Sequence, residues 1–467
     1  MPWISEGSGM ALLSTMGRQG RKGAPISIFV SALLPLLVAM PRIASAVPSF
    51  ATQTGLPCAQ CHVMAFGPQL TEYGRQFKLN GYTFAKQDGG LNIPLAATVF
   101  GGYSNLAKEA PTPSPYSNKE NLALQNVSVY FAGRITDHLG AFVKATYDNI
   151  FGSTAWDTMD VRYARTTEIA GHSTVLGVTV NNNPTAQDLW NSTPAYGFPY
   201  FVSELVPFPV NTAPMLHRLG TTVLGGSVYS MIDSRWYVEL GYYKGVSNKW
   251  LANLGSGGSG QNIVGAAPYG RINWHTQQGP HYLAIGLVGF SVEQQPFSNT
   301  TETNRTTDYG LDASYQFNVG TPRAIDAHAS WIHEKRNLDA SVATGASSST
   351  SNSLDFFEAD VSYVINQTWV PTVAVFNTNG SSNPLLFTPG EIFGSASGSP
   401  TTGGYTLRFE WVPFGKIGSF ASPWVNLRLG AQYTGYWRFN GGSSNYDGFG
   451  RSASDNNSLF VYAWLAF

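Results

Sequence analysis

Apolar and polar residues alternate along most of this chain. From Ile93 onward no helical period persists, and runs of about ten residues place an apolar side chain at every second position. Val127, Val129 and Phe131, for example, occupy one side of such a run, and Asn, Ser and Tyr fill the other side. Successive side chains of a strand point to opposite faces. Each run therefore predicts a strand with one apolar and one polar face.

The segmentation gives about sixteen strands, an even number in the range typical of membrane barrels. The expected strands are 93–104, 121–134, 138–149, 158–167, 172–181, 216–229, 233–245, 268–277, 280–291, 306–318, 323–336, 353–364, 369–378, 402–413, 423–436 and 456–467. We therefore expect an all-β fold, an outer-membrane antiparallel β-barrel whose lumen is water-filled unless plugged. A soluble β-sandwich or propeller is the alternative.

The lengths of the connections predict the orientation of the barrel. Short connections (136–137, 278–279 and 319–322) alternate with long ones at 105–120, 182–215, 246–267, 337–352, 379–401 and 437–455. Outer-membrane barrels have short periplasmic turns and long extracellular loops. We expect both termini on the periplasmic side of the outer membrane of a Gram-negative bacterium. The aromatic stretch 459–467 resembles the terminal-strand signal of such barrels.

Composition narrows the classes of partner. The net charge is -1, and only 12% of the residues are charged, against about a quarter in an ordinary soluble domain. No basic field exists to hold phosphates, so we expect no nucleic-acid partner. The chain has 50 glycines, 27 phenylalanines, 23 tyrosines and 12 tryptophans, which suits a membrane barrel better than a soluble enzyme of this length.

The first residues read as a secretory signal. Basic residues at 18, 21 and 22 precede the apolar run 26–40, and the small residues 44–46 offer a cleavage site. Translation is expected to start at Met10 or Met16, because the basic region begins late. A membrane anchor is the alternative, but the run is short and contains Pro35. The expected division is a signal peptide (1–46), a short segment (47–90) and a barrel (91–467).

A haem attachment motif follows the cleavage site. Cys58-Ala59-Gln60-Cys61-His62 provides two thiols for thioether bonds to one haem c, and His62 as the proximal iron ligand. Cys58 and Cys61 are the only cysteines in the chain. The alternatives are a redox-active disulfide and half of a zinc site. Residues 70–77 predict a short helix, and a segment of about 40 residues needs support from the haem or a larger neighbour. This cytochrome c segment (47–90) is therefore expected to plug or cap the barrel.

The segment from Phe50 to Phe84, joined to such a barrel, resembles the fused monohaem cytochrome-porins in the outer membrane of iron-oxidising bacteria. The stretch Asn183-Pro184-Thr185-Ala186-Gln187-Asp188-Leu189-Trp190-Asn191 adds to the likeness. The resemblance implies that the protein takes electrons from extracellular Fe(II) and passes them to a periplasmic cytochrome c or copper protein. Other external reductants would use the same architecture.

The second axial ligand of the haem iron stays open at this stage. Met64 follows His62 too closely to reach the opposite haem face. Met215 and His217 could reach the lumen if the long 182–215 connection folds inward, and His328 falls on the lumen face of its strand.

Extracellular Fe(II) would need an encounter surface, and oxygen ligands suit a weak, transient contact. The candidates are the carboxylates Asp157, Asp188 and Glu204, which are expected in long loops.

Two functions from different classes remain after the sequence alone. The first is electron transfer across the outer membrane, an oxidoreductase-like activity. The second is a diffusion porin whose haem segment is a structural plug or redox sensor. A haem peroxidase would need an open iron site with an acid-base pair, and none is identifiable. The glycine-rich 255–260 stretch fits a dinucleotide pattern, but it lies between strands and predicts a loop.

Overall fold

The computed structural model describes residues 48–86, 94–193, 197–209, 213–254, 262–296, 300–422 and 424–467. The predicted signal peptide therefore lies outside the described residues. Sixteen antiparallel strands form one closed barrel, in which each strand pairs with its neighbours in sequence and β1 pairs with β16. The strands are β1 (Leu95–Leu106), β2 (Glu120–Arg134), β3 (Leu139–Asp148), β4 (Ser153–Ile169), β5 (His172–Asn181), β6 (Val223–Ile232), β7 (Trp236–Gly245), β8 (Ala267–Gln278), β9 (His281–Gln294), β10 (Asn304–Phe317), β11 (Arg323–Asn337), β12 (Ser351–Ile365), β13 (Trp369–Gly380), β14 (Thr402–Trp411), β15 (Asn426–Arg438) and β16 (Ser458–Ala466). The predicted barrel and strand number are confirmed.

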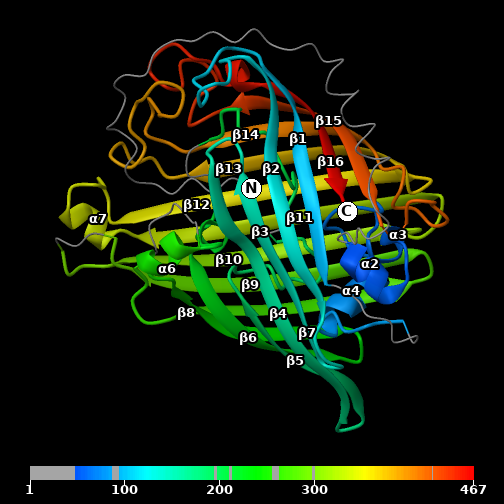
Figure 1. Cartoon of the computed structure of the whole chain (residues 1–467). Coiled ribbons are helices and arrows are strands. Elements are labelled where there is room, and N and C mark those ends of the chain that lie inside the picture. Colours follow the sequence, from blue (N-terminus) through cyan, green and yellow to red (C-terminus); the bar gives the residue numbers. More distant parts are fainter. Residues whose placement is uncertain are drawn as a thin grey trace.

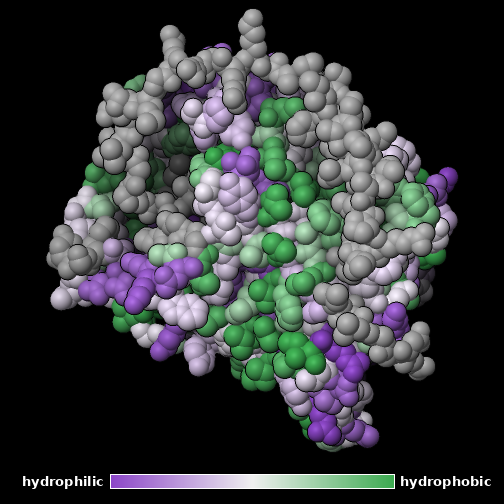
Figure 2. Space-filling model, in the orientation of Figure 1, coloured by the Kyte–Doolittle hydropathy of each residue, from purple (hydrophilic) through white to green (hydrophobic). Residues whose placement is uncertain are grey.

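Each strand carries its apolar face outward, opposite to a soluble protein. On β7, Leu240 is 63% exposed, whereas its neighbour Glu239 is fully buried inside the barrel. On β2, Val129 is 55% exposed and Tyr130 is buried. Figure 2 shows hydrophobic residues gathered over the face that the strands cover, with hydrophilic residues at the tip of the β4 and β5 hairpin. Such an outer surface suits the hydrocarbon of a bilayer.

Short helices occupy the two ends of the barrel. They are α2 (Pro48–Thr54), α3 (Cys58–Cys61), α4 (Glu72–Leu79), α5 (Met215–Arg218), α6 (Asn248–Asn253), α7 (Asp339–Ala343) and the 3-10 helix η2 (Ala453–Asn456). Helices α2, α3 and α4 gather at one end, while α6 and α7 lie at the opposite end (Figure 1). Among the described residues, none of these helices has the length and apolarity needed to cross a membrane.

One predicted strand begins later than expected. The run 216–229 was expected to be extended, but β6 starts at Val223 because residues 215–218 form helix α5. The backbone amides of Met215 and Leu216 donate to the carboxylates of Glu334 and Asp308 on the inner wall. These buried acceptors hold the start of the helix inside the barrel, and local alternation could not reveal them.

Candidate functional site

The Cys-x-x-Cys-His motif forms a single helical turn. Helix α3 starts after Pro57, and the backbone amide of His62 donates to the carbonyl of Cys58 at 2.8 Å. Residues three apart in such a turn lie on the same face. The two thiols are thus presented together, and the histidine follows directly at the end of the turn.

Helix α4 packs tightly against the motif. A Cβ at Gly74 would lie 2.2 Å from the carbonyl oxygen of Cys61, so only glycine permits this contact. Thr71 caps α4 by accepting from the Gly74 amide, and its hydroxyl donates to the carbonyl of Gln60 at 2.6 Å. The same residue therefore starts α4 and fixes the chain between the two cysteines.

Burial keeps the side chains of the motif uncharged. Burial raises the pKa of Cys58 to about 11 and of Cys61 to about 12. Reactive cysteines of redox sites need a stabilised thiolate, which this buried environment does not provide. Burial, followed by the nearby Arg428, lowers the pKa of His62 to about 4, so its imidazole is neutral. Its Nδ1 is buried without a hydrogen-bond partner. Two thiols and a neutral histidine fit a covalently bound haem c.

The helical segment 48–86 is fixed within one end of the barrel by buried polar contacts. Asn426 on β15 donates to the carbonyl of Ala65 at 2.7 Å, and Arg428 donates to the carbonyl of Phe66. On another part of the wall, Arg75 donates to Gln316 of β10 at 2.9 Å. Val63 and Met64 pack against the ends of β11, β12 and β13. We call residues 48–86 the plug.

The long connection between β5 and β6 folds into the barrel. Within it, Asp188 is fully buried, accepts from the amides of Trp190, Ser192 and Thr193, and forms an ion pair with Arg271 at 3.3 Å. Arg271 also holds Asp312 through two bonds of 2.8 Å. We call the described parts of 182–222 the inward segment. The connection thus folds inward, as the candidacy of Met215 and His217 as iron ligands requires.

The inward segment also reaches the wall formed by the first and last strands. Phe201 packs against Phe100 of β1 and Tyr462 of β16, with ring centroids 5.0 and 4.6 Å away. Gln125 of β2 donates to Ser203 at 2.8 Å. The interior is therefore crossed from wall to wall by polypeptide.

The plug and the inward segment are joined to each other by Lys78. Its ammonium donates to the carbonyls of Ala186 and Asp188 at 2.8 and 2.6 Å, and to the Asn191 side chain at 3.1 Å. Asn191 in turn donates to the carbonyl of Pro68 in the plug. The stretch 183–191 thus lies directly against the plug, which carries the Cys-x-x-Cys-His motif.

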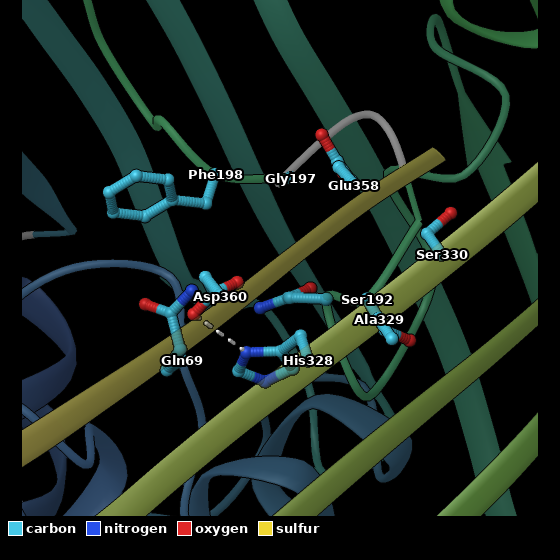
Figure 3. Close-up of a pocket in the computed structure, with 10 residues that line it drawn as sticks. Gln69, Ser192, Gly197, Phe198, His328, Ala329, Ser330, Glu358 and Asp360 are labelled. Carbon is cyan, nitrogen blue, oxygen red and sulfur yellow. Dashed lines mark ion pairs between the residues drawn. The ribbon is translucent and has the colours of Figure 1, made fainter. Parts of the chain in front are cut away.

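His328 faces the interior, as its alternation predicts. It lines a small pocket with Gln69 of the plug and Asp360 of β12, and these three side chains point toward one another (Figure 3). The His328 Nδ1 lies 3.5 Å from Asp360, and its Nε2 lies 3.8 Å from Asp326. Of the three candidate axial ligands, this one lies next to the plug.

Met215 and His217 lie farther along the barrel. The Met215 amide donates to Glu334 of β11. Asp326, eight residues earlier on the same strand, lies at the level of the plug, where it accepts from Gln316. Eight residues of strand span roughly 26 Å. Burial lowers the pKa of His217 to about 4. This placement argues against both residues as iron ligands.

The expected iron-encounter carboxylates do not form a common site. Asp157 was expected in a loop but lies within β4, where it pairs with Lys144 at 2.5 Å. Asp188 belongs to a long connection, yet it is buried with Arg271 rather than open to solvent. Glu204 lies in the inward segment near Gln125. Within the described ranges, no group of three or more His, Cys, Asp or Glu residues is arranged to hold a metal ion.

Sequence reasoning missed the buried charges that position these segments. For example, Arg162 donates to Asp160 at 2.7 Å. Glu410 forms ion pairs with both Arg408 and Arg428. Their signal is a charged residue at an inward position of a strand with an apolar outer face. The pattern marks such residues as inward but does not identify their partners.

Comparisons with known proteins bear on the barrel. No family model and no curated protein matches the sequence. Solved structures with a similar course include the outer membrane channel DcaP of Acinetobacter baumannii (14% identity, 82% of this chain, 99% of that chain, TM-score 0.45). Others are Salmonella typhi OmpF in complex with daunomycin (11%, 80%, 97%, 0.46) and an anion-selective porin from Comamonas acidovorans (10%, 80%, 98%, 0.43).

These scores are low, so the fold assignment rests on the strand pairing and the apolar outer surface. Both define a porin-like β-barrel of the outer-membrane type.

Proposed function

We propose that this protein transfers electrons across the outer membrane through one haem c, bound to Cys58 and Cys61 and ligated by His62. The observation that carries the proposal is the Cys-x-x-Cys-His turn built into one end of a membrane barrel by buried contacts to β10 and β15. When bound, the haem would supply reversible one-electron chemistry. The plug fixes its attachment point, and the barrel insulates it from lipid.

The filled interior supports electron rather than solute passage. The plug and the inward segment cross the lumen and are joined through Lys78. Hydrated solutes need a continuous aqueous path, and the two segments occupy the space in which it would run. An external reductant would then be oxidised without entering the cell. The resemblance of the plug to cytochrome-porins makes extracellular Fe(II) the proposed donor and a periplasmic cytochrome c or copper protein the proposed acceptor.

The proposed orientation places the plug on the periplasmic side. Most connections at the plug end are short, with 412–425 between β14 and β15 as an exception. Most connections at the other end are long, with 149–152 between β3 and β4 as an exception. Outer-membrane barrels face their long loops outward. The donor would accordingly meet the long-loop end and the acceptor the plug end.

The second candidate is a diffusion porin whose haem segment is a plug or sensor. The barrel fold by itself fits this function as well as the first, and sixteen strands are enough for an aqueous channel. The contacts of the inward segment on several walls count against it. The two candidates differ in whether the haem is reduced from outside and whether the pore conducts.

The test uses intact cells that express the chain with haem-maturation machinery. Ferrous iron is added outside, and the haem absorbance bands are followed, with Cys58→Ala/Cys61→Ala as the control. Rapid reduction in the parent alone supports the proposal. A haem that dithionite reduces but Fe(II) does not, together with steady conductance of the purified protein in planar bilayers, would favour the diffusion porin.

A further inference from the structure

Two buried arginines on neighbouring strands have donors without hydrogen-bond partners. The side chains of Arg408 on β14 and Arg428 on β15 are both fully buried. Nε, Nη1 and Nη2 of Arg408 and Nε and Nη1 of Arg428 have no hydrogen-bond partner. Arg408 Nε and Arg428 Nη1 form ion pairs with Glu410, whereas the other three donors have no such contact. Buried charged donors are costly to leave unpaired, so these three donors point to a ligand.

The two arginines share one directly paired carboxylate. Among the described residues, Glu410 is the carboxylate that pairs with both arginines, at 3.5 Å from Arg408 Nε and 3.4 Å from Arg428 Nη1. Tyr462 already donates to Glu410 at 2.5 Å. The nearby Asp360 forms its ion pair with His328. The two guanidinium groups therefore share one directly paired carboxylate, which leaves part of their donor capacity unused.

The pair lies between the plug and the inward segment. Arg428 donates to the carbonyl of Phe66 in the plug. The Arg408 guanidinium lies 4.1 Å from the ring centroid of Phe198 and 4.8 Å from that of Tyr200, both in the inward segment. The buried hydroxyl of Tyr200 also lacks a partner. These groups therefore surround one interior position with unused donors.

The haem attachment point is close to this position. Asn426 precedes Arg428 by one inward position on β15, roughly 7 Å along the strand. The Asn426 side chain donates to the carbonyl of Ala65 in the plug and lies close enough to Cys58 to affect its pKa. The same inner face of β15 thus carries Asn426, near the attachment cysteine, and then Arg428.

We propose that Arg408 and Arg428 form an internal carboxylate-binding site, and that its occupant is a propionate of the haem carried by Cys58 and Cys61. A planar guanidinium binds a carboxylate through paired, charge-assisted hydrogen bonds, which a lysine cannot reproduce. The propionate would accept from the arginine donors that Glu410 does not engage. The assignment of the occupant rests on the proposed function, whereas the site itself rests on the unpaired donors. A free small carboxylate from solution is the other source of the same chemistry.

The experiment compares the haem-loaded parent with Arg408→Gln, Arg428→Gln and the two Lys variants. Arg305→Gln, which removes an exposed arginine paired with Glu293, is the matched control. Haem attachment is measured as the pyridine haemochrome, and folding by heat-modifiable migration in gels. The reduction potential of the haem is then titrated from about pH 4 to about pH 8, a range in which a carboxyl freed from its cation ionises.

The Gln variants are expected to keep their haem but to lower its potential, since removing a positive charge favours the ferric state. Their potential should also become pH-dependent, because the freed propionate titrates. The Lys variants should lie between, and Arg305→Gln should match the parent. Parent-like potentials and pH profiles in folded Gln variants would overturn the assignment.

Two further arms separate the sources of the carboxylate. Sodium propionate added to the haem-loaded parent should leave its potential unchanged. A saturable shift that disappears in Arg408→Gln would instead assign the site to a free anion and overturn the haem propionate. If no haem attaches at all, the proposed function fails. The unfolding temperature of Cys58→Ala/Cys61→Ala with added propionate then tests the site, and the absence of an Arg408-dependent rise would overturn it.

Discussion

The plug and the inward segment fill the same barrel by different means. The plug is held by its own helices and by hydrogen bonds to the wall, and its tightest internal contact is Gly74 against Cys61. The inward segment has little regular structure and depends on one buried carboxylate, Asp188, which gathers three backbone amides and Arg271. The plug thus carries chemistry on a locally folded unit, whereas the inward segment is shaped by the wall.

The largest effect is expected from Asp188→Ala. Removing one partner of a buried ion pair costs about 3–5 kcal/mol, and the amides of Trp190, Ser192 and Thr193 also lose their acceptor. The inward segment should detach while haem attachment stays near the parent level. Conductance in planar bilayers and protease cleavage of the segment measure this. A closed, protease-resistant pore in the variant would contradict the role given to Asp188.

The reciprocal change is Gly74→Ala. The added Cβ meets the Cys61 carbonyl at 2.2 Å, so α4 must move away from α3. Such overpacking costs about 1–3 kcal/mol. Haem attachment should fall, as measured by the pyridine haemochrome, and conductance should change little. Gly289→Ala on β9 is the control, because nothing lies within 4 Å of its Cβ position. Equal haem content in both variants would show that the close approach is unimportant.

Lys78→Met tests the link between the two regions. The substitution leaves the Ala186 and Asp188 carbonyls and the Asn191 amide oxygen without their donor. The expected cost is about 1–3 kcal/mol. Both regions should loosen together, so cleavage of the plug and of the inward segment should rise in parallel under limited proteolysis. Lys249→Met, in the exposed helix α6, is the control. Loosening of one region alone would mean that Lys78 serves only that region.

The smallest effect is a pH dependence confined to the inward segment. Burial, followed by the charge of Asp148, raises the pKa of Glu204 from 4.5 to about 8. The folded segment therefore holds this proton more tightly than the released segment does. Its stabilisation is complete below about pH 4.5 and is lost as the pH rises toward 8. Glu204→Gln should remove the slope of protease resistance against pH, whereas Glu391→Gln, an exposed loop acid, should retain it. A slope unchanged by Glu204→Gln would assign it to another group.

The barrel was predictable from the sequence because the alternation of apolar and polar residues is a local pattern. Alternation along each run identified all sixteen strands, and the inward position of His328 followed from the same rule. The later start of β6 at Val223 was not predictable, because the acceptors that hold Met215 and Leu216 come from β10 and β11. A strand boundary set by partners about 90 or more residues away leaves no local trace.

The candidate site also contains residues that the sequence predicts and residues that it does not. The motif at 58–62 specifies its own chemistry by spacing, so it could be recognised without a structure. The iron-encounter residues could not, since nothing in the sequence around Asp188 or Asp157 shows that each faces a buried or strand-borne cation. The unpaired donors of Arg408 and Arg428 emerge only from counting partners in three dimensions.

The seam between β1 and β16 sets an order of assembly. These strands pair over nine residue pairs from Thr98 with Ala466 to Leu106 with Ser458, so the cylinder cannot shut until the last strand has been made. The plug precedes every strand in the chain, yet it ends up enclosed by them. Closure of the seam therefore completes the wall against which the plug is held. Entry of the plug and closure of the seam are linked steps, and their timing becomes a point at which production of the finished protein can fail.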